Sequence, residues 1–121
     1  ELEAAAFIKV KLMKLGTLDA LAQAIERIRA LGMKPVLGNG VACDLGCWIE
    51  ACVAVRHIDN AGEMNGFLKA RAQLLTEPLE LRDGALRLRP GFAPRLAVER
   101  FKPFIVESRT ASARATTGAT G

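Results

Sequence analysis

Two lysines placed two positions apart are the residues near the start of the chain whose types and spacing could do chemistry. Lys9 and Lys11 alternate with apolar residues in the run from Ala6 to Gly16. Alternate residues of an extended strand share a face, so both ammonium groups are expected on one side. A lysine that sheds its proton in a buried site can act as a general base. The alternative, at similar odds, is a half-buried strand with its lysines in water.

A second polar position follows the short apolar run at 36–38. Asn39 lies between Gly38 and Gly40, and glycines there let the backbone turn sharply or approach a ligand closely. We therefore expect Asn39 to be a substrate-binding residue. The alternative is a plain turn between a strand and a helix.

A third segment, residues 63–68, carries Glu63 and Asn65 and is predicted to form a short strand. In an extended strand both side chains point the same way and Met64 points the opposite way. Glu63 could then hold a cationic or hydroxyl group of a substrate, while Asn65 donates to its carboxylate. The alternative is that Asn65 and Gly66 form a turn and Glu63 is solvated.

The elements that must position these residues alternate between strands and helices. Thr17 is a good N-cap for a helix with apolar residues at helical spacing, and Gly32 ends that helix. A second helix, capped by Asp44 or a neighbouring residue, is expected to end near His57. Strand, helix, strand, helix and strand in this order predict parallel strands covered by helices, usually buried on both faces.

The predicted secondary structure changes after residue 76, from alternating strands and helices to a hairpin. Residues 79–81 and 85–88 alternate around Asp83 and Gly84, which predicts a β-hairpin. Residues 95–101 are expected to form a short helix. From Ser108 onward the chain has no large apolar residue, and we predict a disordered tail at 108–121.

The amino-acid composition argues against a membrane-spanning protein and against a nucleic-acid-binding protein. The chain has 121 residues, half of them hydrophobic, and a net charge of +4. The apolar runs are short, so no membrane span is expected. Basic residues after Arg82 are interleaved with acidic ones and no Tyr is present, so a solvated basic face is preferred to a nucleic-acid site.

Three cysteines without a CxxC pair predict reduced thiols in a cytoplasmic protein. The start at Glu1 suggests a piece of a longer chain.

The residues from Ile8 to Thr17 resemble the sixth barrel strand of the enolase superfamily, in its mandelate racemase and muconate-lactonizing-enzyme-like branch. Residues 36–41 are similar to the seventh strand and its loop, and residues 63–66 to the eighth. Residues 77–91 resemble the segment that leaves the barrel and returns to the capping domain. The resemblance covers roughly residues 6–105.

The resemblance implies an α/β fold: the C-terminal portion of a (β/α)7β TIM-type barrel, with about three βα units, and then a hairpin of the capping domain. Residues 1–76 would be the partial barrel, and residues 77–107 the hairpin and return segment. Active sites of such barrels lie at the C-terminal ends of the strands. Lys9, Asn39, Glu63 and Asn65 are accordingly expected to bind substrate.

Members of this superfamily abstract the proton α to a carboxylate, and a divalent metal, usually Mg2+, stabilises the enediolate. By resemblance Lys11 is the catalytic lysine, while Lys14 lies past the strand end and faces solvent. The metal ligands and a partner lysine come from strands absent here, so we expect no metal site in this chain alone. Dipeptide epimerases carry Asp-x-Asp where this chain has Glu63 and Asn65, which puts amine recognition in doubt.

The expected function is that of a C-terminal part of a racemase, epimerase, cycloisomerase or dehydratase acting on a small carboxylate. The expected protein is a homo-oligomer with no nucleic-acid or membrane partner, and the isolated chain is expected to be inactive. The alternative is a stand-alone, non-catalytic protein that dimerises or binds a partner through exposed strand edges.

Overall fold

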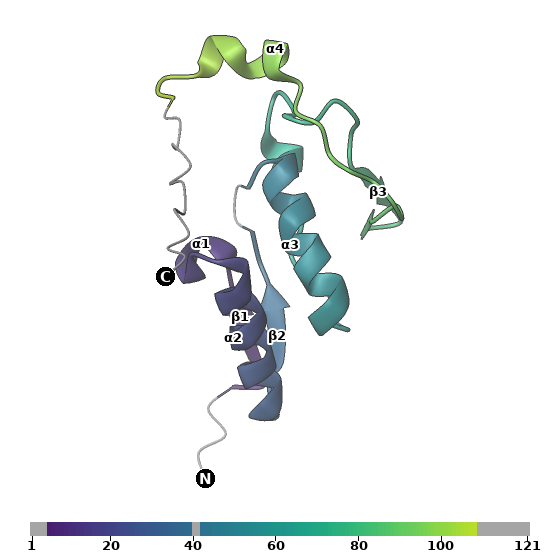
Figure 1. The fold of residues 1–121 in the computed structure, drawn as a ribbon. Coiled ribbons are helices and arrows are strands. Elements are labelled where there is room, and N and C mark those ends of the chain that lie inside the picture. The colour runs from purple at the N-terminus through teal and green to yellow at the C-terminus, as the bar shows by residue number, and fades with distance from the viewer. Residues whose placement is uncertain (1–4, 40–41, 109–121) are drawn as a thin grey trace, which may run out of the picture.

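The computed structural model describes residues 5–39 and 42–108 (Figure 1). They form a small mixed α/β domain with two two-stranded sheets, which confirms the α/β class in this general form. The elements in order are β1 (Phe7–Val10), α1 (Leu12–Leu15), α2 (Leu18–Ala30), β2 (Lys34–Leu37), α3 (Asp44–His57), η1 (Gly66–Lys69), β3 (Glu80–Arg82), β4 (Ala85–Arg87), α4 (Val98–Phe101) and η2 (Lys102–Phe104).

The first sheet is parallel, as the order of elements predicts. β1 pairs with β2, and Lys9 lies opposite Val36 in this register. A third segment continues the sheet at one point only, where Glu63 forms a parallel bridge with Gly38. The strand expected at residues 63–68 is therefore reduced to this bridge, and the chain turns into the 3-10 helix η1.

Helix α2 forms where the sequence predicts it because its start and stop signals are local. The Thr17 hydroxyl accepts a hydrogen bond from the Ala20 backbone N–H at 3.1 Å. Gly32, which follows the helix, has φ 78°, a conformation that favours glycine. The buried residues Leu21 and Ile25 lie on the face that packs against the sheet.

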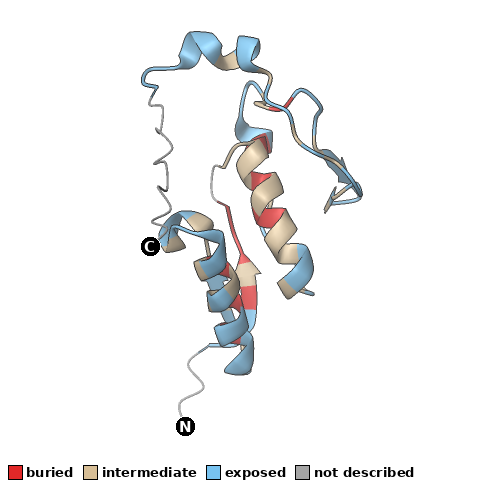
Figure 2. Ribbon diagram, in the orientation of Figure 1, coloured by how far each residue is buried: buried red, intermediate tan, exposed pale blue. Residues whose placement is uncertain are grey.

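Helices α2 and α3 cover the same side of the parallel strands. Buried residues are concentrated on β2 and on the sides of α2 and α3 that face it (Figure 2). The core consists of Leu21, Ile25 and Leu37, packed with partly buried residues from β1, α1, α3 and the segment after it: Val10, Leu12, Leu15, Val53, Ala54, Ile58 and Met64. Burial of this apolar surface is the main stabilising contribution to the sheet and its helices.

The opposite side of the parallel strands differs from the expectation that both faces are buried. Lys9 has a side chain 45% exposed, and Glu63, which points to the same side, is 56% exposed. Val36 and Gly38 share this side with Lys9 by register and contact. No helix or strand among residues 5–39 and 42–108 covers this sheet face.

Asp44 attaches the chain after η1 to the start of α3. Its carboxylate is 1% exposed. Oδ1 accepts hydrogen bonds from the backbone N–H groups of Leu45 and Leu74, and Oδ2 accepts one from that of Leu75 at 2.8 Å. The sequence indicated only a helix-capping role for Asp44, whereas the structure makes it a connection across thirty residues.

The hairpin is confirmed, with β3 antiparallel to β4 and Asp83 and Gly84 between them at φ 52° and 74°. Positive φ at both turn residues is the geometry that suits a two-residue hairpin loop. The chain after the hairpin returns to α3, where the Phe92 ring meets the Trp48 ring edge-on at 6.3 Å. α4 and η2 follow at the end of the molecule far from β1 (Figure 1).

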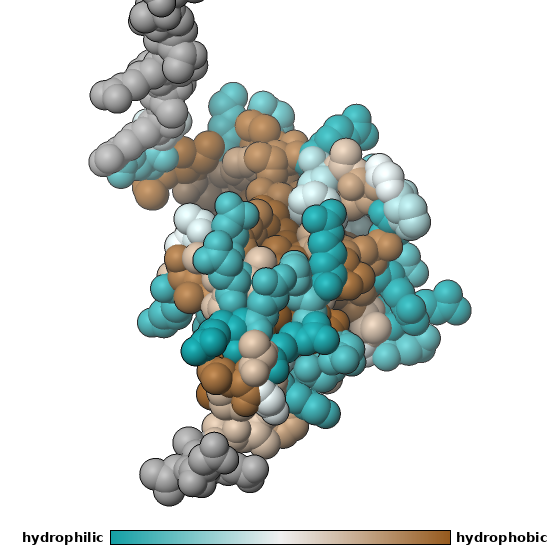
Figure 3. Space-filling view, turned by 60° about the horizontal axis from the view of Figure 1, so that its bottom comes forward, coloured by the Kyte–Doolittle hydropathy of each residue, from teal (hydrophilic) through white to brown (hydrophobic). Residues whose placement is uncertain are grey.

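Hydrophobic side chains are not all enclosed in this fold. Figure 3 shows hydrophobic patches between hydrophilic side chains on the end of the molecule that it presents. Well-exposed apolar residues occur in β1, α1 and η2, as the exposed fractions of Phe7 (58%), Met13 (69%) and Phe104 (76%) illustrate. Within the described part of the chain, no helix is both long and apolar enough to cross a membrane.

Candidate functional site

The uncovered face of the parallel strands brings Lys9 and Glu63 together. The Lys9 ammonium donates to the Glu63 carboxylate in an ion pair that joins β1 to the third parallel segment. Gly38 lies between them, and a Cβ there would lie 2.5 Å from Lys9 Cε and 3.4 Å from Glu63 Oε2. The absence of a side chain at Gly38 therefore leaves room for the pair to cross β2.

This ion pair changes the ionisation of Glu63. The hydrogen bond and the charge of Lys9 lower the pKa of the Glu63 carboxyl, with smaller contributions from Lys11 and Lys69. Glu63 is therefore firmly ionised at neutral pH. Because both side chains are about half exposed, the pair adds little to the stability of the fold.

Lys11 lies at the junction between β1 and α1. β1 ends at Val10, and Lys11 is the extended residue that precedes the single helical turn of α1, with φ −142° and ψ 136°. The Lys14 backbone N–H donates to the Lys11 carbonyl at 3.0 Å, so the chain folds back directly after the strand. Lys9, Lys11 and Lys14 line one shallow cavity together with Val10 and Leu15.

Glu50 approaches this junction from α3, and the sequence pattern did not indicate it. Glu50 is 3% exposed, and its Oε1 accepts a hydrogen bond from the Leu12 backbone N–H at 3.2 Å. Its Oε2 is buried and has no hydrogen-bond partner in the described structure. Burial raises the pKa of the Glu50 carboxyl, while the Leu12 hydrogen bond and the nearby Lys11 charge oppose that rise.

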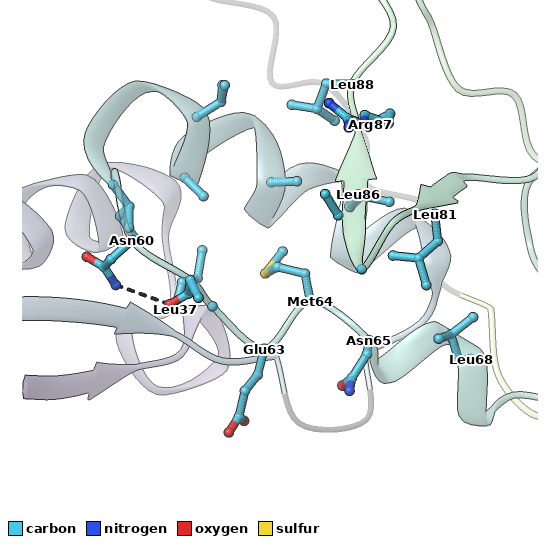
Figure 4. Close-up of a pocket in the computed structure, with 18 residues that line it drawn as sticks. Leu37, Asn60, Glu63, Met64, Asn65, Leu68, Leu81, Leu86, Arg87 and Leu88 are labelled. Carbon is cyan, nitrogen blue, oxygen red and sulfur yellow. Dashed lines mark hydrogen bonds between the residues drawn. The ribbon is translucent and has the colours of Figure 1, made fainter.

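Glu63 and Asn65 point to the same side of their segment, as predicted, although the segment is not a full strand. Figure 4 shows both side chains on one side and Met64 on the other. Asn65 itself has left the extended conformation, with φ −111° and ψ 7°. It is exposed, and its contact with a substrate carboxylate stays a prediction.

Met64 points into an apolar cavity of about 790 Å3 between α3 and the hairpin (Figure 4). Its walls include Leu37 and Ile58 on one side and Leu81, Leu86 and Leu88 on the other. The cavity lies on the opposite side of the 63–65 segment from the carboxylate of Glu63. It is therefore separate from the polar groups on the uncovered sheet face.

Asn39 occupies a different environment from the other predicted site residues. It is 2% exposed, and its side-chain nitrogen donates to Cys47 Sγ at 2.8 Å while its side-chain oxygen accepts from the Gly66 backbone N–H at 3.2 Å. Both polar atoms thus connect β2 to α3 and to η1. Substrate binding by Asn39 stays a prediction, and Gly40 beside it lies outside the described residues.

The carboxylates of the described residues do not fit a Mg2+ site. Magnesium requires near-octahedral oxygen ligation, usually with more than one convergent carboxylate or phosphate. Asp44 is saturated by backbone N–H groups, Glu50 faces the Leu12 peptide, and Glu63 is paired with Lys9. No cluster of three or more His, Cys, Asp or Glu side chains occurs in the part of the chain that the structure describes.

Three features of the site were missed or understated from the sequence. Glu50 lies in the apolar stripe of α3, and an acidic residue surrounded by apolar ones was the available signal. Asp44 looked like a local cap because its partners at Leu74 and Leu75 are distant in sequence. Lys14 was expected to face solvent; it is exposed, and it also lines the cavity with Lys11.

Fold and site together define a small mixed α/β domain with a lysine-rich polar face on its parallel sheet. No protein-family model matches this chain. No curated protein matches it either.

Proposed function

We propose that this chain is the C-terminal part of an enolase-superfamily enzyme, which abstracts the proton α to a carboxylate. In this proposal β1, β2 and the Glu63 bridge are the sixth, seventh and eighth strands of a (β/α)7β barrel. The uncovered sheet face would be the barrel interior, and residues 77–107 would return to the capping domain. The complete enzyme would be a cytoplasmic homo-oligomer acting on a small carboxylate.

The observation that carries the proposal is the arrangement of polar groups on the parallel strands. Lys9 and Glu63 lie on the face without helices, whereas the apolar residues of the same strands pack under α2 and α3. Lys11 follows the C-terminal end of β1, which is the end of a parallel strand where barrel enzymes hold their reactive groups. A half-uncovered parallel sheet with charged groups on its open face is unusual, because such sheets are normally covered on both sides.

Lys11 and Lys9 differ in their charged neighbours. Lys9 is engaged by Glu63, whereas Lys11 has no ion pair among the described residues. Two carboxyl groups interact with the Lys11 charge: the buried Glu50, whose pKa is raised by burial, and Glu63, which is paired with Lys9.

The metal that such an enzyme uses would be held by residues outside this chain. By the resemblance, its carboxylate ligands belong to the third to fifth strands, which this chain lacks. Bound there, the metal would stabilise the negative charge that develops on the substrate carboxylate. The described residues contribute the lysines and Glu63, and none of the steps assigned to them passes through the metal.

The test is solvent-deuterium exchange at the substrate α-carbon in a complete barrel that contains this segment. We expect Lys11→Ala to abolish exchange while the protein remains folded, because the base is removed. Lys14→Ala is the matched control on the next turn, and its exchange rate at saturating substrate should be nearly unchanged. Exchange retained in the Lys11→Ala variant would rule out the assigned role.

A non-catalytic protein that associates through strand edges is the second candidate function. β1 pairs only with β2 among the described strands, so its other edge is open, and Phe7, the first residue of β1, is 58% exposed. Open edges with apolar neighbours favour pairing with another chain. Sedimentation of the 121-residue chain tests this function: a stable dimer that Phe7→Lys dissociates would support it, and a monomer would exclude self-pairing.

A further inference from the structure

Glu50 is a buried acidic residue on the otherwise largely apolar inner side of α3. It is 3% exposed, and its Oε2 has no hydrogen-bond partner in the described structure. Burying a carboxyl group costs free energy unless hydrogen bonds or opposite charges offset that cost. The groups that favour the ionised form of Glu50 are the Leu12 backbone N–H and the charge of Lys11. Both belong to the junction between β1 and α1.

The helical turn α1 begins without a cap of its own. Its N-cap residue is Lys11, whose side chain makes no capping hydrogen bond. A lysine ammonium can only donate, so it cannot accept from the first N–H groups of a helix as Ser, Thr, Asp or Asn would. Glu50 Oε1 accepts from the Leu12 N–H at 3.2 Å and supplies this acceptor from thirty-eight positions away. A helix of four residues is not stable by itself, so α1 depends on such contacts.

The next helix along the chain shows the ordinary arrangement. At the start of α2 the Thr17 hydroxyl accepts from the Ala20 N–H, so the N-cap residue caps its own helix. At the start of α1 the acceptor comes from α3 instead, and the Lys11 side chain has no capping task. Local helix stability therefore does not account for a lysine at this position.

We propose that Glu50 is a positioning residue for Lys11. By accepting from the Leu12 N–H, its carboxylate fixes the start of α1 and keeps Lys11 extended, with φ −142° and ψ 136°, at the C-terminal end of β1. The lysine side chain then leaves the backbone from a fixed point. The catalytic meaning of this role rests on the proposed function, but the effect of Glu50 on the junction can be measured in the chain without any turnover.

The first experiment follows the Leu12 amide signal of the full 121-residue chain by NMR as the pH is lowered from neutral. Protonation of Glu50 weakens the hydrogen bond that its Oε1 accepts, so the Leu12 amide proton should move upfield. Burial raises the pKa of Glu50, so this change should be centred above the usual range for a glutamate. The other ionisable groups that interact with the Glu50 carboxyl in the described structure are Lys11 and Cys47. Glu50→Gln keeps both and should abolish the change.

The second experiment compares two variants of Glu50 at neutral pH. Glu50→Leu removes the acceptor, whereas Glu50→Gln keeps an oxygen that can accept from the Leu12 N–H. In Glu50→Leu we expect the Leu12 amide to exchange with solvent about three- to tenfold faster, as the loss of one hydrogen bond implies. The three-bond HN–Hα coupling of Lys11 should fall from the large value of an extended residue. Glu50→Gln should keep both quantities near their wild-type values.

Phe92→Ala is the control for a general loosening of α3. Phe92 contacts Trp48, which lies two positions before Glu50 and therefore on another side of the helix. This variant should leave the Leu12 exchange rate and the Lys11 coupling unchanged.

Three results would overturn the proposal: a Leu12 signal that does not titrate in the wild type, equal effects of Glu50→Gln and Glu50→Leu, or an equal effect of Phe92→Ala. The wild-type titration needs no variant, so it decides the question if Glu50→Leu does not fold.

The catalytic part of the proposal is tested in a complete barrel that contains this segment. Glu50→Leu should lower the rate of deuterium exchange at saturating substrate by up to about 100-fold, with a smaller change in KM, because a small displacement of a reacting group has an effect of this order. Glu50→Gln should recover most of the rate. Full exchange in Glu50→Leu, where Lys11→Ala has none, would overturn the positioning role. If the wild-type barrel shows no exchange, the proposed function fails while the NMR result on the chain stands, so the two failures are distinguishable.

Discussion

Two carboxyl groups near Lys11 are shifted in opposite directions by their surroundings. Burial raises the pKa of Glu50, whereas the hydrogen bond and charge of Lys9 lower the pKa of Glu63. A carboxyl with a raised pKa makes the folded state lose stability as pH rises from the unfolded pKa through the folded one. A carboxyl with a lowered pKa stabilises the folded state above its unfolded pKa, and that stabilisation is lost as pH falls through the folded pKa.

The two isosteric variants Glu50→Gln and Glu63→Gln should therefore respond to pH with opposite signs. Relative to the wild type, Glu50→Gln should become more stable on going from acid to neutral pH, because the penalty for ionising a buried carboxyl is gone. Glu63→Gln should become less stable over the same change, because it cannot ionise and pair with Lys9. Urea unfolding at neutral pH and at a pH below the unfolded pKa of both carboxyls measures these differences.

The pH dependence is the informative quantity for Glu50→Gln. The glutamine oxygen can still accept from the Leu12 N–H, but its amino group enters a site without an acceptor, which adds a cost at every pH. A difference from the wild type that has the same size at both pH values would contradict the environment assigned to Glu50.

At the scale of elements, Gly38 and Gly66 both lie where neighbouring atoms leave no room for a side chain. The two positions differ in which atoms those neighbours are. A Cβ on Gly66 would lie 2.8 Å from the Ala42 backbone nitrogen and 2.8 Å from Asn39 Oδ1. A Cβ on Gly38 would lie 2.5 Å from Lys9 Cε, which is part of a flexible side chain. Backbone atoms cannot yield as a lysine side chain can.

Gly66→Ala should therefore destabilise the fold by about 1–3 kcal/mol, the usual cost of overpacking. Gly38→Ala should cost clearly less, because Lys9 can rotate away at the expense of its exposed pair with Glu63. Denaturant midpoints of the two variants check the order. Equal costs, or a larger cost for Gly38→Ala, would mean that η1 does not pack against Ala42 as described.

Elements with local signals could be predicted from the sequence, and elements set by distant contacts could not. Thr17 and Gly32 specify the ends of α2, and Asp83 and Gly84 specify the hairpin turn. The segment after Glu63 has a strand-like pattern, yet Gly66 donates to Asn39, twenty-seven positions earlier, and the chain turns into η1. A pattern read along the chain carries no information about such a partner.

The same limit applies to the candidate site. Alternation in β1 placed Lys9 and Lys11 correctly at the strand and its end, and alternation put Glu63 and Asn65 on one side. The pairing of Lys9 with Glu63 depends on three parallel segments in register, which spacing alone does not specify. The contact of Glu50 with the Leu12 backbone N–H depends on how α3 packs against α1, which the spacing of residues in the sequence does not specify.

At the scale of the whole molecule, acidic side chains are dispersed rather than convergent. We expect the 121-residue chain to bind Mg2+ without useful affinity, because no three His, Cys, Asp or Glu side chains cluster within the described residues, and Asp44, Glu50 and Glu63 are engaged by backbone groups or a lysine. Isothermal titration calorimetry with MgCl2 measures this directly. A tight site with one Mg2+ per chain would contradict the expectation and would require ligands other than those described.

The parallel sheet of the described residues is open and does not close into a barrel. The described strands form an open sheet whose second face bears Lys9, Val36 and Glu63. The order of the elements predicted the parallel pairing of β1 and β2. The barrel therefore stays a proposal, whereas the mixed α/β class is observed.

The buried carboxylate of Asp44 sets a lower limit on how far this chain can be shortened. Its acceptors are satisfied by the amides of Leu74 and Leu75, and the same stretch pairs with residues 95–97 beyond the hairpin. Deleting the chain from residue 74 onward would remove two of the three backbone N–H donors to this carboxylate, so the start of α3 would lose its connection to the later part of the chain. The smallest folding unit thus extends past the third parallel segment, and a truncated gene product that stops there should be a substrate for proteolysis.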